Sequence, residues 1–454
     1  MSGSPAMGPF YRVLSDSSDI TQRFIRTQLP ENAIVRAYLI SRSIEKGQMM
    51  DGGNSRKADH TGKLGRETTF DKVALDAARR WKRLDLDKAR AELFHQRARD
   101  NAATYRRNIE SYIGTVDIPV GLAGPLRING RNGTATYQVP LATTEAALVA
   151  SYQRGSRLIT AAGGCNVRVL DQGVSRTPMF AFVSLVDAER FARFITDHSG
   201  DLHAVVAKIT SHGRLIGARP VVEGNHVYVD LRFNTGDASG QNMVTFASDA
   251  VCKAILEQAP VKPEHWFLEA NFSGDKKASS KTLGDVRGKR VAADIYIPRE
   301  LVRQRLHTTP ERIVDYWYAG ALGGVMSGTT GIQGHFANGL AALYLACGQD
   351  VACVAESATG TTRFERTAEN DLYASVTLPN IMVGTVGGGT GLPSAKACLD
   401  ILGLAGAGNS IALAEVCAAI VLAGELSIVG ALCSGDFATA HLSLSRGESR
   451  NKNG

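Results

Sequence analysis

MFAFVSLV at residues 179–186 opens the stretch that decides the fold, and DAERFARFITDH (187–198), RPVVEGNHVYVDLRF (219–233) and NMVTFASDAVCKAILEQ (242–258) follow it. The first and third segments are short runs rich in β-branched and aromatic residues, which is typical of strands. The second and fourth segments carry apolar residues at helical spacing. Strands that alternate with helices in this way predict a small α+β unit over residues 178–268.

The chain on either side of this unit has a different character. Residues 1–60 are mixed and end in a polar stretch, so we expect an N-terminal extension there. Residues 61–112 are highly charged, and their apolar residues at helical spacing (Val73, Ala77, Trp81; Leu86, Ala89, Leu93) predict a helical subdomain. Residues 113–177 and 269–434 combine strands with Ala/Gly-rich helices and predict a larger domain. Residues 435–454 are expected to form a frayed C-terminal flap.

Charge and composition exclude several classes of function. The 454-residue chain has a formal net charge of +7 and a pI near 9.0, which favours anionic partners, either nucleic acid or phosphorylated small molecules. Because it has no dense basic run, zinc-finger pattern or aromatic RNA-binding signature, nucleic acid is not the expected partner. The seven cysteines form no CxxC pair, so we expect neither disulfides nor a metal site, and a cytoplasmic location.

One segment is long and apolar enough to raise the question of a membrane span, VCAAIVLAGELSIVGALC at residues 416–433. Glu425 lies at its centre, where a carboxylate costs about 2.5–3.5 kcal/mol on insertion scales. The alanines and glycines around it suit close packing, so we expect a buried core helix and no membrane span. The N-terminus also lacks the pattern of a signal peptide.

Four side chains could carry chemistry, and each has a simpler alternative. Lys276, in the loop NFSGDKKASS, could present an ammonium to a developing oxyanion, or lie in a solvated turn. Asp350 ends a predicted helix, where the dipole disfavours a carboxylate, so it pairs with a cation or lies in solvent. Glu145 opens a predicted helix and is either a first-turn capping residue or an acid in a water-poor pocket. His441 is either structural or a mobile proton donor.

Two glycine-rich stretches could let backbone amides approach a pyrophosphate. They are DASGQN (237–242) and GTVGGGTG (384–391). Neither has the spacing of the dinucleotide fingerprint or of a P-loop, so a plain turn is the alternative for each.

In this order, the motifs resemble one family. IGTVDIPVGLAGPL, PLATTEAALVAS, GDASGQNM, GDKKA, HFAN with YLACGQD, LPNIMVGTVGGGT, GELS and a late histidine are similar to the blocks of 3-hydroxy-3-methylglutaryl-CoA reductases with a class I-like catalytic domain. The resemblance runs from about Asn108 to Arg446, and the segment before residue 60 has no counterpart. It implies an α+β fold in which a large substrate domain carries an inserted ferredoxin-like cofactor domain, and a soluble form with a mobile C-terminal flap.

The resemblance also implies residue roles. Lys276 would stabilise the carbonyl oxygen as hydride arrives, and Asp350 would tune Lys276 and Glu145. Glu145 would protonate the aldehyde oxygen, and His441 would protonate the departing thiolate. The implied cofactor is NADPH, with NADH as the alternative, and its expected contacts are Ser211, His212, Asp237, Ser239, Gly240, Asn242, Gly387, Gly388 and Gly389. The expected substrate contacts are Arg176, Glu269, Asp275, Lys277, Tyr318 and Asn338.

Four positions depart from the family pattern. Tyr318 stands where members that make mevalonate commonly have a lysine that reaches the substrate carboxylate, and Glu269 stands where a serine is common. Losing a cation and gaining a carboxylate disfavours a free carboxylate on the substrate. Ala146 replaces a usual glycine, and His212 stands where an arginine is usual near the 2′-phosphate.

The expected function is NAD(P)H-dependent reduction of 3-hydroxy-3-methylglutaryl-CoA to mevalonate and free CoA, in two hydride transfers through a thiohemiacetal and an aldehyde. The alternative keeps the reaction but changes the substrate to another acyl-CoA or carrier-protein thioester. A non-catalytic homologue is a third hypothesis, which the retention of all four reactive residues disfavours. The family builds its site across a dimer interface, so the resemblance implies a homodimer or an assembly of dimers.

Overall fold

The described part of the chain runs from residue 67 to residue 435 in a computed structural model. The N-terminal extension, His441 and nearly all of the C-terminal flap therefore lie outside the described residues.

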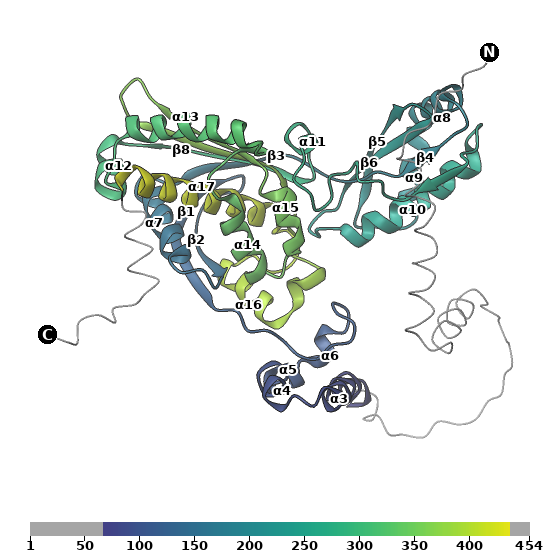
Figure 1. Cartoon of the computed structure of the whole chain (residues 1–454), viewed down its shortest axis with the longest axis horizontal. Helices are drawn as coiled ribbons and strands as arrows, with labels where there is room; N and C mark the ends of the chain where they lie inside the picture. The colour runs from purple at the N-terminus through teal and green to yellow at the C-terminus, as the bar shows by residue number, and fades with distance from the viewer. Residues whose placement is uncertain (1–66, 436–454) are drawn as a thin grey trace, which may run out of the picture. The chain divides into compact units, whose positions relative to one another are not determined.

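Four helices follow one another at the start of the described chain (Figure 1). They are α3 (Glu67–Leu84), α4 (Asp87–Leu93), α5 (Gln96–Asp100) and α6 (Ala102–Tyr105). Trp81, Phe94 and Tyr112 form a core of their own, and the Trp81 indole donates a hydrogen bond to the Ile113 carbonyl at 2.6 Å. Leu86 was expected on the buried face but is exposed, because α3 ends at Leu84 and the left-handed Asp85 redirects the chain.

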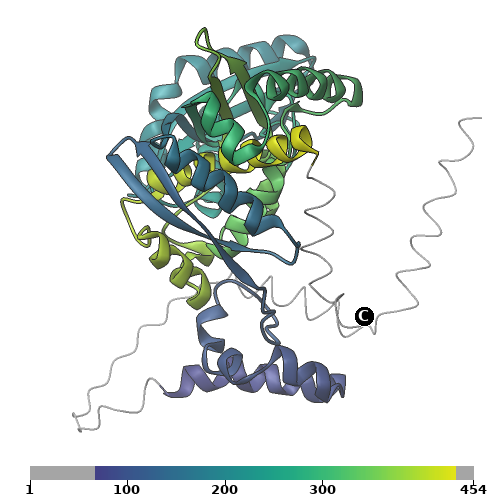
Figure 2. The ribbon, with the colours of Figure 1, turned by 90° about the vertical axis from the view of Figure 1, so that its left-hand side faces the viewer.

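A mixed sheet forms the centre of the larger unit. Its strands lie in the order β3-β8-β11-β10-β9, and the β1–β2 hairpin, the two long blue strands of Figure 2, adds to it through β3. The strands are β1 (Val120–Gly130), β2 (Gly133–Ala142), β3 (Cys165–Arg176), β8 (Gly288–Ile297), β9 (Gly331–Ile332), β10 (Gly360–Arg366) and β11 (Leu372–Ile381). The helices of this unit are α7 (Leu148–Ala161), α11 (Lys281–Gly284), α12 (Arg299–Leu306), α13 (Pro310–Ser327), α14 (Phe336–Ala346), α15 (Val354–Ser357), α16 (Pro393–Leu402) and α17 (Ser410–Ser434), with 3-10 turns η2 (Val351–Cys353) and η3 (Gly388–Gly391).

The smaller unit lies between Met179 and Phe267 and has β-α-α-β-β-α-β connectivity. Its elements are β4 (Met179–Ala181), α8 (Leu185–Asp197), α9 (Ser199–Ala207), β5 (Arg214–Glu223), β6 (His226–Asn234), α10 (Gln241–Gln258) and β7 (His265–Phe267). The antiparallel strand order is β7-β4-β6-β5, and without α9 the order of the elements would be that of a ferredoxin-like unit. The long strand β3 joins the two units, since its first part pairs with β8 and its last three residues pair with β6.

Two segments fold differently from their predicted structure. Only the first three residues of MFAFVSLV form a strand, because Ser184 accepts a hydrogen bond from the Asp187 amide and so begins α8. The single β-type run 219–233 is a hairpin, broken at Gly224, whose φ of 56° suits a tight turn.

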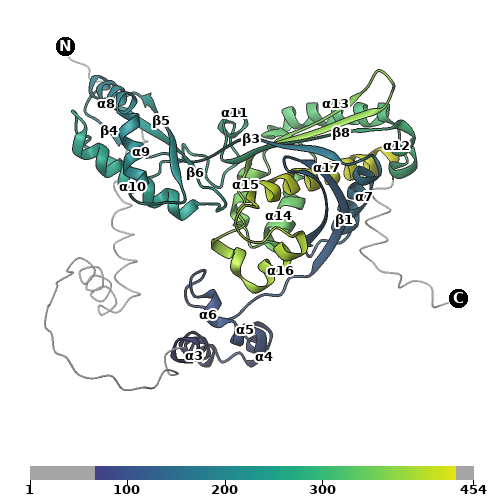
Figure 3. The same cartoon turned by 180° about the vertical axis from the view of Figure 1, so that it is seen from behind.

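Helix α17 is the central helix of the larger unit. Figures 1 and 3 both show it between the strands of the sheet and α14. Its apolar residues surround the whole helix, which is typical of a buried one, and 89% of its most apolar window is buried inside the protein. It is long and apolar enough to cross a membrane, but it lies in the protein core, as the sequence predicted.

Hydrogen bonds to the buried Glu425 side chain explain why a carboxylate is tolerated at the centre of α17. Glu425 is only 1% exposed, and it accepts hydrogen bonds from the amides of Gly334 and His335, both at 2.8 Å, and from the Thr362 hydroxyl at 2.7 Å. It therefore fixes the turn that leads into α14.

Replacing Glu425 by alanine is expected to lower the free energy of unfolding by about 3–5 kcal/mol, because it leaves the buried Thr362 hydroxyl and the amides of Gly334 and His335 without their acceptor. Urea denaturation followed by circular dichroism measures this loss. A change below about 1 kcal/mol would show that water replaces the carboxylate.

Candidate functional site

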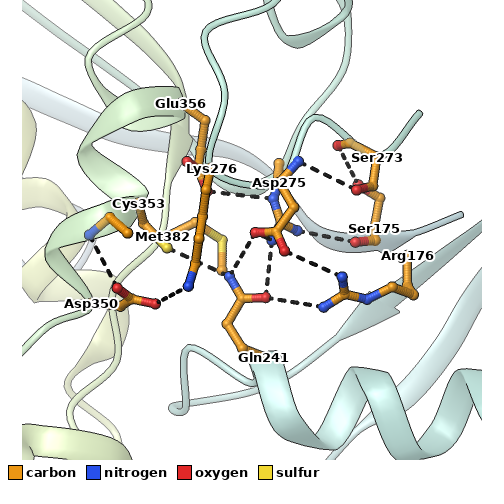
Figure 4. A network of polar contacts seen from close by, with 12 residues as sticks. Ser175, Arg176, Gln241, Ser273, Asp275, Lys276, Asp350, Cys353, Glu356 and Met382 are labelled. Carbon is orange, nitrogen blue, oxygen red and sulfur yellow. Dashed lines mark hydrogen bonds and ion pairs between the residues drawn. The ribbon is translucent and has the colours of Figure 1, made fainter. Parts of the chain in front are cut away.

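Lys276 lies in a strained turn that points its ammonium at Asp350. The φ angle of Lys276 is 55°, and Asn271 and Gly274 of the same loop have φ angles of 64° and 74°. A left-handed conformation costs about 1–2 kcal/mol for a residue with a side chain, so surrounding contacts must hold it. The Lys276 Nζ atom lies 2.9 Å from an Asp350 carboxylate oxygen (Figure 4). The prediction that Lys276 and Asp350 meet is thus realised in the geometry.

Asp350 has the cationic partner that its position after α14 requires. It also begins the turn η2, where its other oxygen accepts a hydrogen bond from the Ala352 amide at 3.1 Å. The hydrogen bond and charge of Asp350 raise the pKa of Lys276 above its usual value. The lysine is therefore held as a cation at neutral pH, ready to stabilise negative charge.

A cluster of buried and half-buried charges adjoins the lysine. Arg176 lies 3.2 Å from Asp275 and 3.4 Å from Glu269, and Asp275 also forms an ion pair with Arg287. Burial acts to raise the pKa of Asp275, but Arg287 and Arg176 outweigh it and hold that pKa below its usual value. Glu269 does not extend freely into solvent, because one oxygen also accepts from the Thr177 amide at 3.3 Å.

The two glycine-rich stretches of the sequence pack directly against each other. The Thr385 amide donates to the Asp237 carbonyl at 2.9 Å, and a Cβ at Gly384 would lie 2.5 Å from the Ser239 nitrogen. A Cβ at Gly387 or Gly388 would meet nothing within 4 Å, so the backbone there is open to a ligand. Such a surface could admit a pyrophosphate beside the start of α10.

Asp237 itself holds these loops together. Its carboxylate accepts hydrogen bonds from the amides of Gly408 at 2.7 Å and Ser410 at 3.2 Å. Burial acts to raise the pKa of Asp237, but these hydrogen bonds outweigh it and lower that pKa. Gly240, at φ 77°, is the residue before α10, where a Cβ would lie 2.3 Å from the Thr235 methyl group.

Glu145 lies at the opposite end of α14 from the Lys276–Asp350 pair. Its carboxylate accepts a hydrogen bond from Asn338, in the first turn of α14, at 3.5 Å. Asp350 follows the far end of the same helix, which is about 16 Å long at 1.5 Å per residue. The interpretation of Glu145 as a first-turn cap is wrong, because α7 begins only at Leu148, after a left-handed Ala147.

The remaining predicted residues lie at several places on these units. Ser211 and His212 are exposed in the turn before β5, and Asn242 is exposed in the first turn of α10. Lys277 is exposed, and its ammonium donates to the Asp275 carbonyl at 2.9 Å. Tyr318 is 64% exposed on α13.

Sequence reasoning missed several residues that support the lysine loop. Arg287 and Glu356 are buried, and Gln241 links Arg176 and Arg287. Lys289, 4% exposed, donates to the Val383 carbonyl at 3.1 Å, and burial lowers its pKa to about 8. The signal in the sequence was the charged run DVRGKR, which leads directly into an apolar strand. Charged residues are rarely buried, so Arg287 and Lys289 looked like surface residues.

A solved reductase structure has a similar arrangement. A class II 3-hydroxy-3-methylglutaryl-CoA reductase from Streptococcus pneumoniae, bound to NADPH in open conformations, matches with a TM-score of 0.59. It is 21% identical, and the match covers 77% of this chain and 96% of that one. At this identity the likeness shows the fold, an α+β architecture shared with reductases of this class.

The family follows from the amino-acid sequence. The model of the hydroxymethylglutaryl-coenzyme A reductase family matches residues 76–446, which begins earlier than the expected Asn108. A 3-hydroxy-3-methylglutaryl-coenzyme A reductase of Aeropyrum pernix is 46% identical over 76% of this chain and 83% of its own length. That of Pyrococcus horikoshii is 42% identical over 75% and 84%. The chain belongs to the hydroxymethylglutaryl-coenzyme A reductase family.

Proposed function

We propose that this chain reduces 3-hydroxy-3-methylglutaryl-CoA to mevalonate and free CoA, with NADPH as the reductant. The observation that carries the proposal is the Lys276–Asp350 pair, 2.9 Å apart, on a strained loop within a chain of this family. The Lys276 ammonium, held in place by Asp350, can stabilise the oxyanion that forms when a thioester carbonyl is reduced.

The site residues divide the reaction between them. NADPH, when bound, supplies hydride for each of two reductions. Lys276 donates a hydrogen bond to the carbonyl oxygen as it gains negative charge, first in the thioester and then in the aldehyde. After the carbon–sulfur bond breaks, His441 gives a proton to the thiolate, so that free CoA leaves. Glu145 gives the proton that converts the aldehyde oxygen to the hydroxyl of the product.

Glu145 and Lys276 can act on one substrate if two copies of the chain build each site. Within one chain, Glu145 contacts Asn338 near the start of α14, whereas Lys276 contacts Asp350 beyond its end. A homodimer that places Glu145 of one copy beside Lys276 of its partner resolves this separation.

Helix α13 offers a surface that such a dimer would cover. Tyr318, Leu322, Val325 and Met326 recur at helical spacing and are between 62% and 79% exposed. An apolar stripe of this kind on a helix is typical of an interface rather than of a solvated face. A homodimer or an assembly of dimers is therefore the proposed state.

The open glycines support binding of the cofactor at the junction of the two units. The open residues Gly387 and Gly388 would face the pyrophosphate together with Ser239, Gly240 and Asn242 of the smaller unit, and Gly389, whose Cβ would lie 2.5 Å from the Gly348 carbonyl oxygen, would hold this loop close to its neighbour. Ser211 and His212 are exposed and free to approach the 2′-phosphate of NADPH. A neutral or charged histidine gives weaker discrimination than arginine, so NADH remains the alternative. All seven cysteines are free and buried, which suits the proposed cytoplasmic location.

One observation favours the second candidate, a thioester whose acyl group lacks a terminal carboxylate. Arg176 already has two carboxylate partners, Glu269 and Asp275, where the resemblance implies a contact with the acyl substrate. A third carboxylate on the substrate would have to compete with Glu269 for this cation.

Glu269→Ser is therefore expected to lower the KM for 3-hydroxy-3-methylglutaryl-CoA by about tenfold, which corresponds to about 1.4 kcal/mol. Initial rates with this substrate and with butyryl-CoA measure the effect, and the KM for butyryl-CoA should change little. An unchanged KM for the carboxylated substrate would remove the competition argument. Turnover of butyryl-CoA alone by the unmodified protein would establish the second candidate.

A further inference from the structure

A fully buried carboxylate lies directly behind the reactive lysine. Glu356 on α15 has no exposed surface, and neither of its oxygens has a hydrogen-bond partner within the described part of the chain. The backbone amides of Glu356 itself and of Lys276 act to lower the pKa of this carboxyl, but neither completes a hydrogen bond to it. Figure 4 shows Glu356 beside Lys276, on the side away from the Asp350 carboxylate. A buried charge is rarely retained without a partner or a task.

Arg287 is the cation nearest to this carboxylate and connects four segments. It is 1% exposed, and its Nε atom lies 3.5 Å from Glu356. The guanidinium also donates to the Ser175 carbonyl and to the Gln241 side chain, each at 3.0 Å, and forms the ion pair with Asp275. Strand β3, the start of α10, the lysine loop and α15 therefore meet at one side chain.

The lysine loop depends on these contacts for its conformation. Lys276 is a non-glycine residue at φ 55°, a conformation that is unfavourable by itself. Asp275, its neighbour, is held by Arg287 and Arg176, and Arg287 in turn faces Glu356. A shift of Arg287 would therefore move Asp275 and the adjoining lysine together.

We infer that Arg287 and Glu356 form a positioning pair that holds Lys276 at the reacting carbonyl and couples its loop to the start of α10. Neither residue touches the substrate. The pair acts through Asp275 and the Lys276 backbone, so the kinetic part of this inference rests on the proposed function. The smaller unit is coupled through Gln241, which contacts Arg287 and Arg176.

The ionisation of Glu356 gives this pair a measurable signature. The groups that face it are Arg287, Asp275, Lys276, Cys353 and Tyr344. Burial raises the pKa of Glu356 to about 7, against the lowering effect of Arg287. Above that pH the carboxylate is charged and attracts Arg287, and below it the attraction is lost. The ionised form is therefore the one that positions the lysine.

The same ionisation sets the sign of its effect on stability. The pKa of Glu356 in the folded protein lies above its usual value, so folding favours the protonated form. The charged form makes the fold less stable as pH rises through about 7. A neutral replacement removes that effect, and Asp275 still pairs with Arg287.

Glu356→Gln tests the pair, with Glu415→Gln as the matched control. Glu415 is also a buried glutamate with a raised pKa, but it bonds the Arg131 amide at the β1–β2 turn. We expect Glu356→Gln to lower kcat at pH 8 by about 10- to 100-fold, with both KM values within about twofold. The wild type and Glu415→Gln should lose kcat below pH 7 with a midpoint near 7, and Glu356→Gln should lack that midpoint. A wild-type kcat and pH profile in Glu356→Gln would overturn the inference.

Hydrogen exchange tests the pair without any substrate. Residues 271–281 and 237–245 should exchange faster in Glu356→Gln than in the wild type at pH 8, and not in Glu415→Gln. The melting temperature of Glu356→Gln relative to the wild type should rise between pH 5 and pH 8. Unchanged exchange in both segments would contradict a positioning role. So would a Glu356→Gln protein that loses activity and also melts at a lower temperature than the wild type, because the loss of activity would then follow from a weakened fold. If the wild type fails to reduce the thioester, the proposed function fails, and exchange alone decides this inference.

Discussion

Lys276→Ala is expected to lower kcat for thioester reduction by about 10²–10³-fold, because it removes the cation that meets the developing oxyanion. The ammonium lies 2.9 Å from Asp350, and its pKa is raised, so it is present as a cation throughout the neutral range. Stopped-flow and steady-state measurement of NADPH oxidation with 3-hydroxy-3-methylglutaryl-CoA give the change. The KM values should move far less than kcat, since the interaction forms chiefly in the transition state.

The fold should survive this substitution. Lys276 is an exposed side chain, and an exposed ion pair contributes about 1 kcal/mol or less to stability. Lys253→Ala is the matched control, because Lys253 is an exposed lysine on α10 that pairs with Asp249 one turn away. It should retain full activity. A Lys276→Ala protein with more than about a tenth of the wild-type kcat would exclude the assigned role.

Glu145→Gln and Lys276→Ala, each nearly inactive alone, are expected to recover about a quarter of the wild-type rate of alcohol formation when co-expressed. The reason is geometric. Glu145 and the Lys276–Asp350 pair lie at opposite ends of α14, so each site takes Glu145 from one copy and Lys276 from the other. Half of the randomly mixed dimers then contain both chains, and one of their two sites is intact. Purification through two different tags isolates these mixed dimers, which should then show about half of the wild-type rate.

Lys276→Ala co-expressed with Asp350→Ala provides the control for this experiment. These two residues contact each other within one chain, so no mixed site can contain both. Recovery should therefore be absent. Equal recovery in the two mixtures, or none in the first, would refute a site shared between copies.

The sequence predicted the α+β fold and the central helix because both depend on local patterns. The run 416–433 is apolar on every side with one carboxylate, and α17 buries that carboxylate against the turn before α14. The packing of DASGQN on GTVGGGTG could not be read from spacing, because Gly384 and Ser239 meet only through the fold.

The side-chain network behind Lys276 was harder to predict. Arg287 and Glu356 are separated by 69 positions in the chain, and each resembles an ordinary surface charge in its own segment. Their burial depends on how β3, α10 and α15 converge. The capping alternative for Glu145 fails for a related reason, since the left-handed Ala147 delays the start of α7 and no local pattern signals it.

The stoichiometry of the reaction tests the central claim most directly. The purified full chain is incubated with 3-hydroxy-3-methylglutaryl-CoA and NADPH, and free thiol and oxidised cofactor are measured together. We predict two molecules of NADPH oxidised for each thiol released, with both products forming about 10²–10³-fold more slowly in Lys276→Ala. Release of thiol without oxidation of NADPH, or oxidation that persists unchanged in Lys276→Ala, would contradict the assignment of this chain as a reductase acting through Lys276.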